Sequence, residues 1–125
     1  MGFPVSEAEQ LVKRQLDAYN AKDIEAFMAV WADDAELYEH PATLLARGAA
    51  EIRRRHEERF REPFLYGKLL TRIAVGSTVV DHEEVTRTFP EGRGTVAVIA
   101  IYSVAGGKIQ KAWFIAGPKT IEAPV

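Results

Sequence analysis

Four side chains that can transfer a proton or form a hydrogen bond occupy positions from which the folded chain could bring them together. Glu39 and His40 precede Pro41 at the end of a short predicted strand, and alternation turns one of them toward the interior. His56 and Gln15 lie on the apolar faces of two predicted helices. Because an imidazole titrates near neutral pH and burial raises the pKa of a glutamate, this set predicts a site for general acid–base chemistry.

Each of these residues also has a structural interpretation, and the sequence leaves both open. Gln15 can be a helix-edge amide that reaches water. His56 can be a core histidine with satisfied hydrogen bonds, because it shares a helix face with Ile52. Glu39 and His40 can be a strand end in solvent. In the catalytic interpretation, Glu39 or His40 takes a proton, and His56 and Gln15 hydrogen-bond the oxygen that gains charge.

The remaining charged clusters favour solvated surfaces. The run at 81–84 (DHEE) predicts the wet face of a sheet, with His82 as an alternative member of an acid–base pair. The arginines at 53–55 predict the wet side of a helix. Because His40, His56 and His82 are isolated in sequence, we expect no metal site and no cofactor. Metal-assisted hydrolysis would require the histidines to converge in space.

Large aromatic side chains should form the walls of any pocket, because ligand pockets are mostly apolar with few polar groups. We expect four residues to contact the ligand: Trp31, Tyr19, Phe60 and Phe114.

Size and composition predict one domain over residues 1–125. The chain is 47% hydrophobic and 27% charged, with a net charge of -2, which argues against a nucleic-acid partner. It contains no cysteine, which excludes disulfides and thiolate sites. Neither a signal peptide nor an apolar run of membrane-spanning length is present, so we expect a cytoplasmic protein without a membrane partner.

The first half of the chain has a helical pattern. Ser6 and Glu9 form a capping box before the first helix, which ends near Asn20. Asp23 should cap a second helix whose apolar face extends to Trp31. We then expect a strand over 35–39, a loop over 41–48, and a third helix from 49 to about 61.

The second half has the pattern of strands, expected over 64–75, 79–89, 95–104 and 109–116. The third of these is almost entirely apolar and should be covered on both faces. Gly117 and Pro118 should end the last strand. Helices followed by a meander of long strands indicate an α+β fold with a mostly antiparallel sheet.

Five segments support a resemblance to a known family across residues 6–117. These are LVKR at 11–14, NAKD at 20–23, WADDA at 31–35, RG at 47–48 with IR at 52–53, and GGKI at 106–109. The chain resembles the nuclear transport factor 2-like superfamily, and more narrowly its ketosteroid isomerase and SnoaL-like branch. The resemblance implies a cone of three N-terminal helices on a strongly curved sheet that encloses a pocket, and a homodimer formed through the sheet.

The resemblance also implies which positions would do chemistry. Ketosteroid isomerases combine a carboxylate base with an oxyanion hole made of a Tyr and a protonated Asp. Here the base position falls on Glu39 or His40, and the Tyr position falls on Gln15. The Asp position falls within 99–101, where no side chain can donate a proton, and His56 takes a supporting aromatic position.

We therefore do not expect classical steroid isomerisation. The first hypothesis is an enzyme that isomerises, cyclises or dehydrates a small apolar carbonyl or cyclic compound by cofactor-free proton transfer. The second is a non-catalytic ligand-binding or dimeric interaction module, favoured by the missing acid in the central strand.

Overall fold

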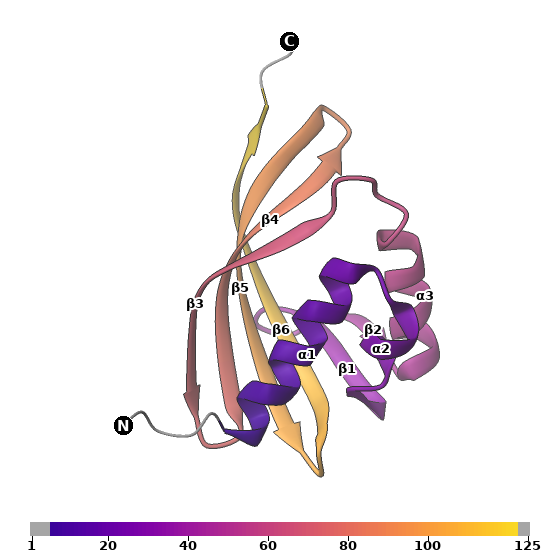
Figure 1. Ribbon diagram of the computed structural model, residues 1–125, viewed down its shortest axis with the longest axis vertical. Coiled ribbons are helices and arrows are strands. Elements are labelled where there is room, and N and C mark those ends of the chain that lie inside the picture. Colours follow the sequence, from indigo (N-terminus) through magenta and orange to yellow (C-terminus); the bar gives the residue numbers. More distant parts are fainter. Residues whose placement is uncertain (1–5, 123–125) are drawn as a thin grey trace.

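The computed structural model describes residues 6–122, which form three helices and a six-stranded sheet (Figure 1). The prediction about a signal peptide concerns the N-terminal residues, of which 1–5 lie outside the described range. Within that range, none of the helices has the length and apolarity that crossing a membrane requires.

The first helix, α1 (Glu7–Ala21), begins as the capping box predicts. The Ser6 hydroxyl accepts a hydrogen bond from the backbone N–H of Glu9 at 3.1 Å. The helix ends at Lys22, which adopts a left-handed conformation. Its buried face carries Gln15 and Tyr19 toward the sheet.

The second helix is shorter than predicted. Asp23 caps α2 (Ile24–Met28) through a 3.1 Å bond from the N–H of Ala26, but the helix has only five residues. Trp31 already begins strand β1 (Trp31–Glu39), so its spacing from Ile24 does not reflect a shared helix face. A buried Trp31 is compatible with a strand as well as with a helix, and for this reason the helical periodicity assigned it to the wrong element.

Two other predicted boundaries are wrong. The expected loop at 41–48 contains strand β2 (Thr43–Arg47), which pairs antiparallel with β1. The last strand, β6 (Lys108–Ile121), continues through Gly117 and Pro118 along β5. The other elements are α3 (Ala49–Arg59), β3 (Tyr66–Val75), β4 (Thr78–Phe89) and β5 (Gly92–Ala105).

The strands form one curved, unclosed sheet in the order β2-β1-β6-β5-β4-β3. Only the β1–β6 pair is parallel. The helices pack on one face of this sheet, with α1 lying across the long strands and α3 beyond β1 and β2 (Figure 1). The α+β cone predicted from the sequence is thus confirmed.

The register determines which side chains share the face beneath the helices. Val79 pairs with Tyr102, and Asp81 pairs with Ala100, so these four side chains point to the concave side. On the opposite face, residues such as Ile101 are only half-buried, which corrects the expectation that β5 is covered on both faces.

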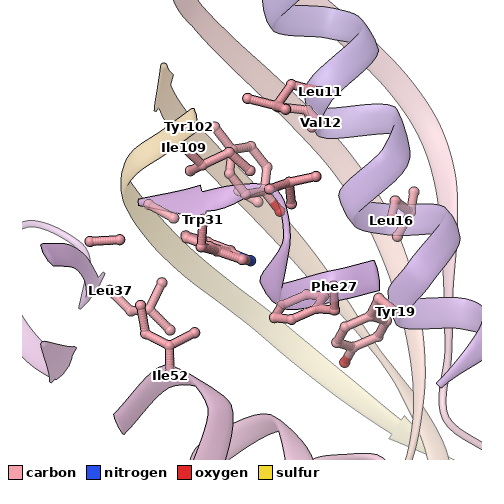
Figure 2. Packing of buried hydrophobic residues seen from close by; sticks show 14 of the residues in the cluster. Leu11, Val12, Leu16, Tyr19, Phe27, Trp31, Leu37, Ile52, Tyr102 and Ile109 are labelled. Carbon is pink, nitrogen blue, oxygen red and sulfur yellow. The ribbon is translucent and has the colours of Figure 1, made fainter. Parts of the chain in front are cut away.

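The core lies between α1, α2 and the concave face. Figure 2 shows Phe27 beside Tyr19, with their ring centroids 6.3 Å apart, and shows Ile52 facing Leu37. Trp31 packs between Phe27, at 5.7 Å, and Tyr102, at 6.4 Å. This aromatic layer fixes the backbone of the elements that surround the cavity described next.

Candidate active site

A cavity of about 450 Å³ lies between the helices and the concave face of the sheet. This volume falls within the usual range of small-molecule sites, about 300–1,000 Å³. Its walls combine apolar side chains with an unusual number of charged and hydrogen-bonding groups. Besides residues named below, the lining contains Leu16, Leu37, Leu45, Val85, Val96, Val98, Ala100, Ile115 and Ala116.

All four predicted catalytic residues line this cavity, but in two different environments. Gln15 and His56 are buried, with 6% and 7% of their surfaces exposed. Glu39 and His40 are exposed and lie at the edge of the lining. Both contribute to it, although alternation predicted that only one would face inward.

Three of the four predicted wall residues, Trp31, Tyr19 and Phe114, also line the cavity. Phe60 is not part of the lining. Its ring packs instead against Tyr19 and Phe27, each with a centroid distance of 5.6 Å. Phe60 therefore supports the wall from behind.

The predicted wet patch at 81–84 is half wrong. His82 and Glu84 are exposed, but Asp81 is fully buried and Glu83 is only 6% exposed. Glu83 lines the cavity. The signal was present in the sequence, because Asp81 and Glu83 alternate in phase with the apolar Val79 and Val85.

The two buried carboxylates differ in their partners. Asp81 accepts two hydrogen bonds from Arg72, at 2.7 and 2.8 Å, in a bidentate ion pair. Glu83 forms no ion pair with any residue from 6 to 122. Burial, together with the negative charge of Asp81, raises the pKa of Glu83 to about 7, and Arg72 only partly opposes this.

A glycine makes room for the Glu83 carboxylate. A Cβ atom built on Gly67 would lie 2.9 Å from Glu83 Oε1 and 3.0 Å from Leu16 Cδ1. Gly67 is held in place by Asn20, whose amide donates to its carbonyl at 2.9 Å and accepts from its N–H at 2.7 Å. A side chain at position 67 would therefore displace the Glu83 carboxylate and the end of the Leu16 side chain from these positions.

His56 uses its donor within α3, so that it can offer only an acceptor to a ligand and not the donor that we expected. Its Nδ1 lies 2.8 Å from the carbonyl oxygen of Ile52, which can only accept, so Nδ1 carries the proton. Burial lowers the pKa of His56 to about 4, and the charges of Arg59 and Arg55 add to this effect. Its Nε2 is therefore unprotonated at neutral pH and has a lone pair that can accept a hydrogen bond.

Several further polar groups, both donors and acceptors, belong to residues of the cavity wall. The indole N–H of Trp31 and Oε1 of Gln15 are buried without a hydrogen-bond partner among the described residues. Burial raises the pKa of the Tyr19 hydroxyl, opposed by Arg59, and raises that of Tyr102 well above its ordinary value. Both hydroxyls thus keep their protons at neutral pH.

Arginines surround one side of the cavity. Arg55, Arg59 and Arg87 line both the cavity and a second, more open hollow of about 620 Å³. Glu62 lies in that outer hollow and pairs with Arg87 at 2.5 Å. The expectation that residues 53–55 all lie on the wet side of α3 is thus wrong for Arg55, which is half-buried at the cavity.

This arrangement suits proton transfer in a largely dry site. Glu83 can accept a proton near neutral pH, and the hydroxyl donors of Tyr19 and Tyr102 can stabilise negative charge on a bound oxygen. Residues 6–122 contain no group of three or more His, Asp or Glu side chains arranged to hold a metal ion.

Comparison with known proteins identifies the family. The model of the SnoaL-like domain matches residues 12–112. The chain belongs to the SnoaL-like domain family. This confirms the predicted resemblance to nuclear transport factor 2-like and SnoaL-like proteins, whereas a search of curated protein sequences finds no match.

Solved structures support the SnoaL-like fold. A cystatin-fold protein from Novosphingobium aromaticivorans is 26% identical, with a TM-score of 0.80 over 90% of this chain and 99% of its own. A proposed ketosteroid isomerase from Kribbella flavida is 20% identical, with a TM-score of 0.75 over 95% and 83%. An epoxide hydrolase of the LEH-like type from M. tuberculosis is 18% identical, with a TM-score of 0.75 over 89% and 83%.

Proposed function

We propose that this SnoaL-like protein is a cofactor-free acid–base enzyme. It transfers a proton at a carbon next to the carbonyl group of a small, largely apolar compound, leading to isomerisation, cyclisation or dehydration. The observation that carries the proposal is Glu83, a carboxylate without an ion-pair partner that lines the cavity with a pKa of about 7. A base with a pKa near the working pH combines the right protonation state with sufficient strength.

Glu83, rather than Glu39 or His40, takes the proton in this proposal. Its carboxylate removes a proton from the substrate carbon, and the electron pair moves onto the carbonyl oxygen. The protonated Glu83 then returns the proton to another carbon in isomerisation, or to a departing hydroxyl, which leaves as water, in dehydration. Glu39 and His40 are exposed at the cavity edge, where they would contact an entering substrate.

The developing negative charge needs donors that are already in place. The hydroxyls of Tyr19 and Tyr102, which line the cavity and keep their protons at neutral pH, would supply them. The unprotonated Nε2 of His56 would accept a hydrogen bond from a substrate hydroxyl. These roles replace the donor role that the sequence suggested for His56.

Two observations support this class of chemistry over others. The cavity concentrates polar groups on otherwise apolar walls, as acid–base sites do. Structurally similar proteins include a proposed ketosteroid isomerase, a proposed polyketide cyclase and an epoxide hydrolase.

The base can be tested without the natural substrate. The probe is 5-nitrobenzisoxazole, which loses a ring proton to a base while its N–O bond breaks, and which yields a coloured 2-cyano-4-nitrophenolate. We expect the wild-type rate to rise with pH through about 7, where Glu83 loses its proton. Glu83→Gln should lower the rate by at least about 100-fold.

Glu84→Gln is the matched control, because Glu84 is the next residue on β4 and is exposed. It should leave the elimination rate unchanged. A Glu83→Gln protein that retains its fold by circular dichroism and eliminates at the wild-type rate would refute the proposed base.

A non-catalytic ligand-binding role is the alternative, favoured by one specific observation. Of residues 99–101, where the resemblance places the protonated Asp of a ketosteroid isomerase, Ala100 is the one that faces the concave side, and it cannot donate a proton. In that case, wild type and Glu83→Gln would bind apolar probes equally, and neither would accelerate the elimination above free glutamate.

We also propose that a second copy of the chain covers the convex face of the sheet. A row of apolar side chains crosses this face, formed by Ile73, Val80, Ile101 and Trp113, and Ile73 is 60% exposed. Sedimentation analysis should give a dimer that Ile73→Glu weakens. A monomeric wild type at micromolar concentration would contradict this assembly.

A further inference from the structure

Three arginines at the cavity have no role in the proposed proton transfer, and their arrangement indicates what kind of substrate the cavity binds. Arg55 and Arg59 are four residues apart on α3, and Arg87 on β4 lies close enough to Arg55 to repel it. Like charges at this helical spacing destabilise a helix rather than support it. Helix stability therefore gives no reason to place Arg55 beside the other two arginines.

The three arginines differ in their ion-pair partners. Glu62 binds Arg87 through two contacts, at 2.5 and 3.3 Å, and reaches Arg59 at 4.0 Å. Arg55 makes neither an ion pair nor a hydrogen bond within residues 6–122. Glu39, the exposed carboxylate of the lining, pairs with none of the three.

The surroundings of Arg55 make its lack of an ion-pair partner significant. The side chain is half-buried at the cavity, and burial together with Arg59 and Arg87 lowers its pKa from the usual value. An unpaired guanidinium in such a place is costly to the free protein, because a charge is partly withdrawn from water without a counter-ion. A bound anion would remove that cost.

We propose that the substrate of this site carries one carboxylate group, which Arg55 binds at the cavity mouth while the apolar remainder of the molecule extends toward Glu83. This inference rests on the proposed function in treating the cavity as a substrate site. A planar guanidinium fork matches a carboxylate through two parallel hydrogen bonds.

The count of charges favours a carboxylate over a phosphate. A phosphate monoester carries nearly two negative charges at neutral pH. The three guanidiniums of Arg55, Arg59 and Arg87 are opposed by the carboxylates of Glu62 and Glu39 and, when it is ionised, by that of Glu83, so at most one positive charge is uncompensated. One positive charge matches one carboxylate, and a second negative charge would lie in a cavity that already contains Glu83.

Binding of matched probes tests the inference. The probes are 2-naphthoate, its neutral analogue 2-naphthamide and the dianion 2-naphthyl phosphate, each titrated by calorimetry at low ionic strength. We expect wild type to bind the carboxylate about tenfold more tightly than the amide, as for a charge-assisted hydrogen-bonded pair. The phosphate should bind no more tightly than the carboxylate, and added salt should reduce the preference.

Variants of two neighbouring arginines then locate the effect. Arg55→Gln should lose about tenfold in affinity for 2-naphthoate, with little change for the amide. Arg54→Gln is the matched control, because Arg54 is exposed and outside both hollows, and it should keep the preference. Without ligand, Arg55→Gln should unfold at the same urea concentration as wild type or higher, because it removes a repulsive charge.

Several results would overturn the inference. They are equal wild-type affinity for carboxylate and amide, no binding of either, a phosphate bound tenfold more tightly, or a preference that survives Arg55→Gln. The proposed base fails separately, since Glu83→Gln should abolish elimination while retaining the carboxylate preference. If Glu83→Gln kept both the preference for the carboxylate and the wild-type elimination rate, Glu83 would not be the base and the bound carboxylate could not be described as part of a substrate.

Discussion

Glu62 and Glu83 lie in two regions that both contain arginines, yet their carboxylates have opposite properties. Glu62, in the outer hollow, accepts hydrogen bonds from Arg87 and the N–H of Thr88. Burial raises its pKa, but these bonds outweigh burial and hold the pKa below the ordinary value. Glu83, at the cavity, has no such donor, and its pKa rises to about 7.

The difference shows that pairing, more than burial, determines what a carboxylate can do in this protein. The guanidinium near Glu83 is that of Arg72, and it already donates two hydrogen bonds to the carboxylate of Asp81. The Arg72–Asp81 pair therefore withholds a partner from Glu83 and adds a repelling negative charge. Four predictions test this comparison, from the largest expected effect to the smallest.

Releasing Arg72 should turn the Glu83 region into a copy of the Glu62 region. Asp81→Asn should destabilise the protein by roughly 3 kcal/mol, because it breaks a buried ion pair. Arg72 should then pair with Glu83 and lower its pKa below 7, which moves the elimination profile to lower pH. Urea unfolding and the pH–rate profile measure the two effects. Asp34→Asn, at an exposed position, is the control, and a midpoint that stays near pH 7 would contradict the pairing argument.

The raised pKa of Glu83 should appear in the pH dependence of stability. The folded state holds a proton up to about pH 7 that the unfolded chain releases near 4.5, so this contribution is present below about 4.5 and lost as pH rises through 7. Relative to wild type, Glu83→Gln should therefore gain about 2–3 kcal/mol between pH 5 and pH 8. Urea unfolding of both proteins at each pH measures the difference, and a constant difference would exclude a raised pKa.

His56 contributes the opposite slope. Its pKa falls from 6.5 to about 4 in the folded state, so its contribution to stability is present above about 6.5 and lost as pH falls through 4. The two slopes overlap in wild type and largely cancel between about pH 4.5 and 6.5. Glu83→Gln should expose the His56 slope as a loss of stability on acidification.

Filling the space at Gly67 should disturb Glu83 without changing any charge. Gly67→Ala places a Cβ atom 2.9 Å from Glu83 Oε1, and we expect overpacking to cost about 1–2 kcal/mol and to lower the elimination rate. Gly117→Ala is the control, because its nearest atoms would lie 3.4 and 3.5 Å away. Equal melting temperatures for the two variants would show that the Glu83 carboxylate is not tightly placed.

The smallest effect is expected at the paired carboxylate. Glu62→Gln removes the partner of Arg87, but both side chains are partly solvated, so the loss of stability should be at most about 1 kcal/mol. The same change makes the arginine region more positive and should tighten binding of 2-naphthoate. Weaker binding after this substitution would contradict the proposed charge balance.

Much of the fold could be predicted from the sequence, because its signals are local. The capping box at Ser6, the cap at Asp23 and the turns at Gly76 and Gly106 act within a few residues. Strand β2 was missed because five residues with one buried member have little periodicity. Its position depends on pairing with β1, which is a tertiary constraint.

The site was less predictable because chemistry here depends on which face a residue occupies. A run of four polar residues resembles solvent-exposed surface, yet alternate members of 81–84 lie beneath the helices. The phase with Val79 and Val85 contained that information. The contrast between Arg54 and Arg55 had no local signal, because it depends on where α3 packs.

The reciprocal hydrogen bonds between Asn20 and Gly67 have a consequence for access to the cavity. Together with the bond from Lys22 to the Glu62 carbonyl, they join the end of α1 to the segment that leads into β3. The walls carrying Tyr19 and Glu83 thus move as one body. Helix α3 joins the same body, because His56 packs on Phe27 of α2 with ring centroids 4.4 Å apart and Ile52 is fully buried. Ligand entry should therefore take place at the exposed edge of the cavity, where Glu39 and His40 lie.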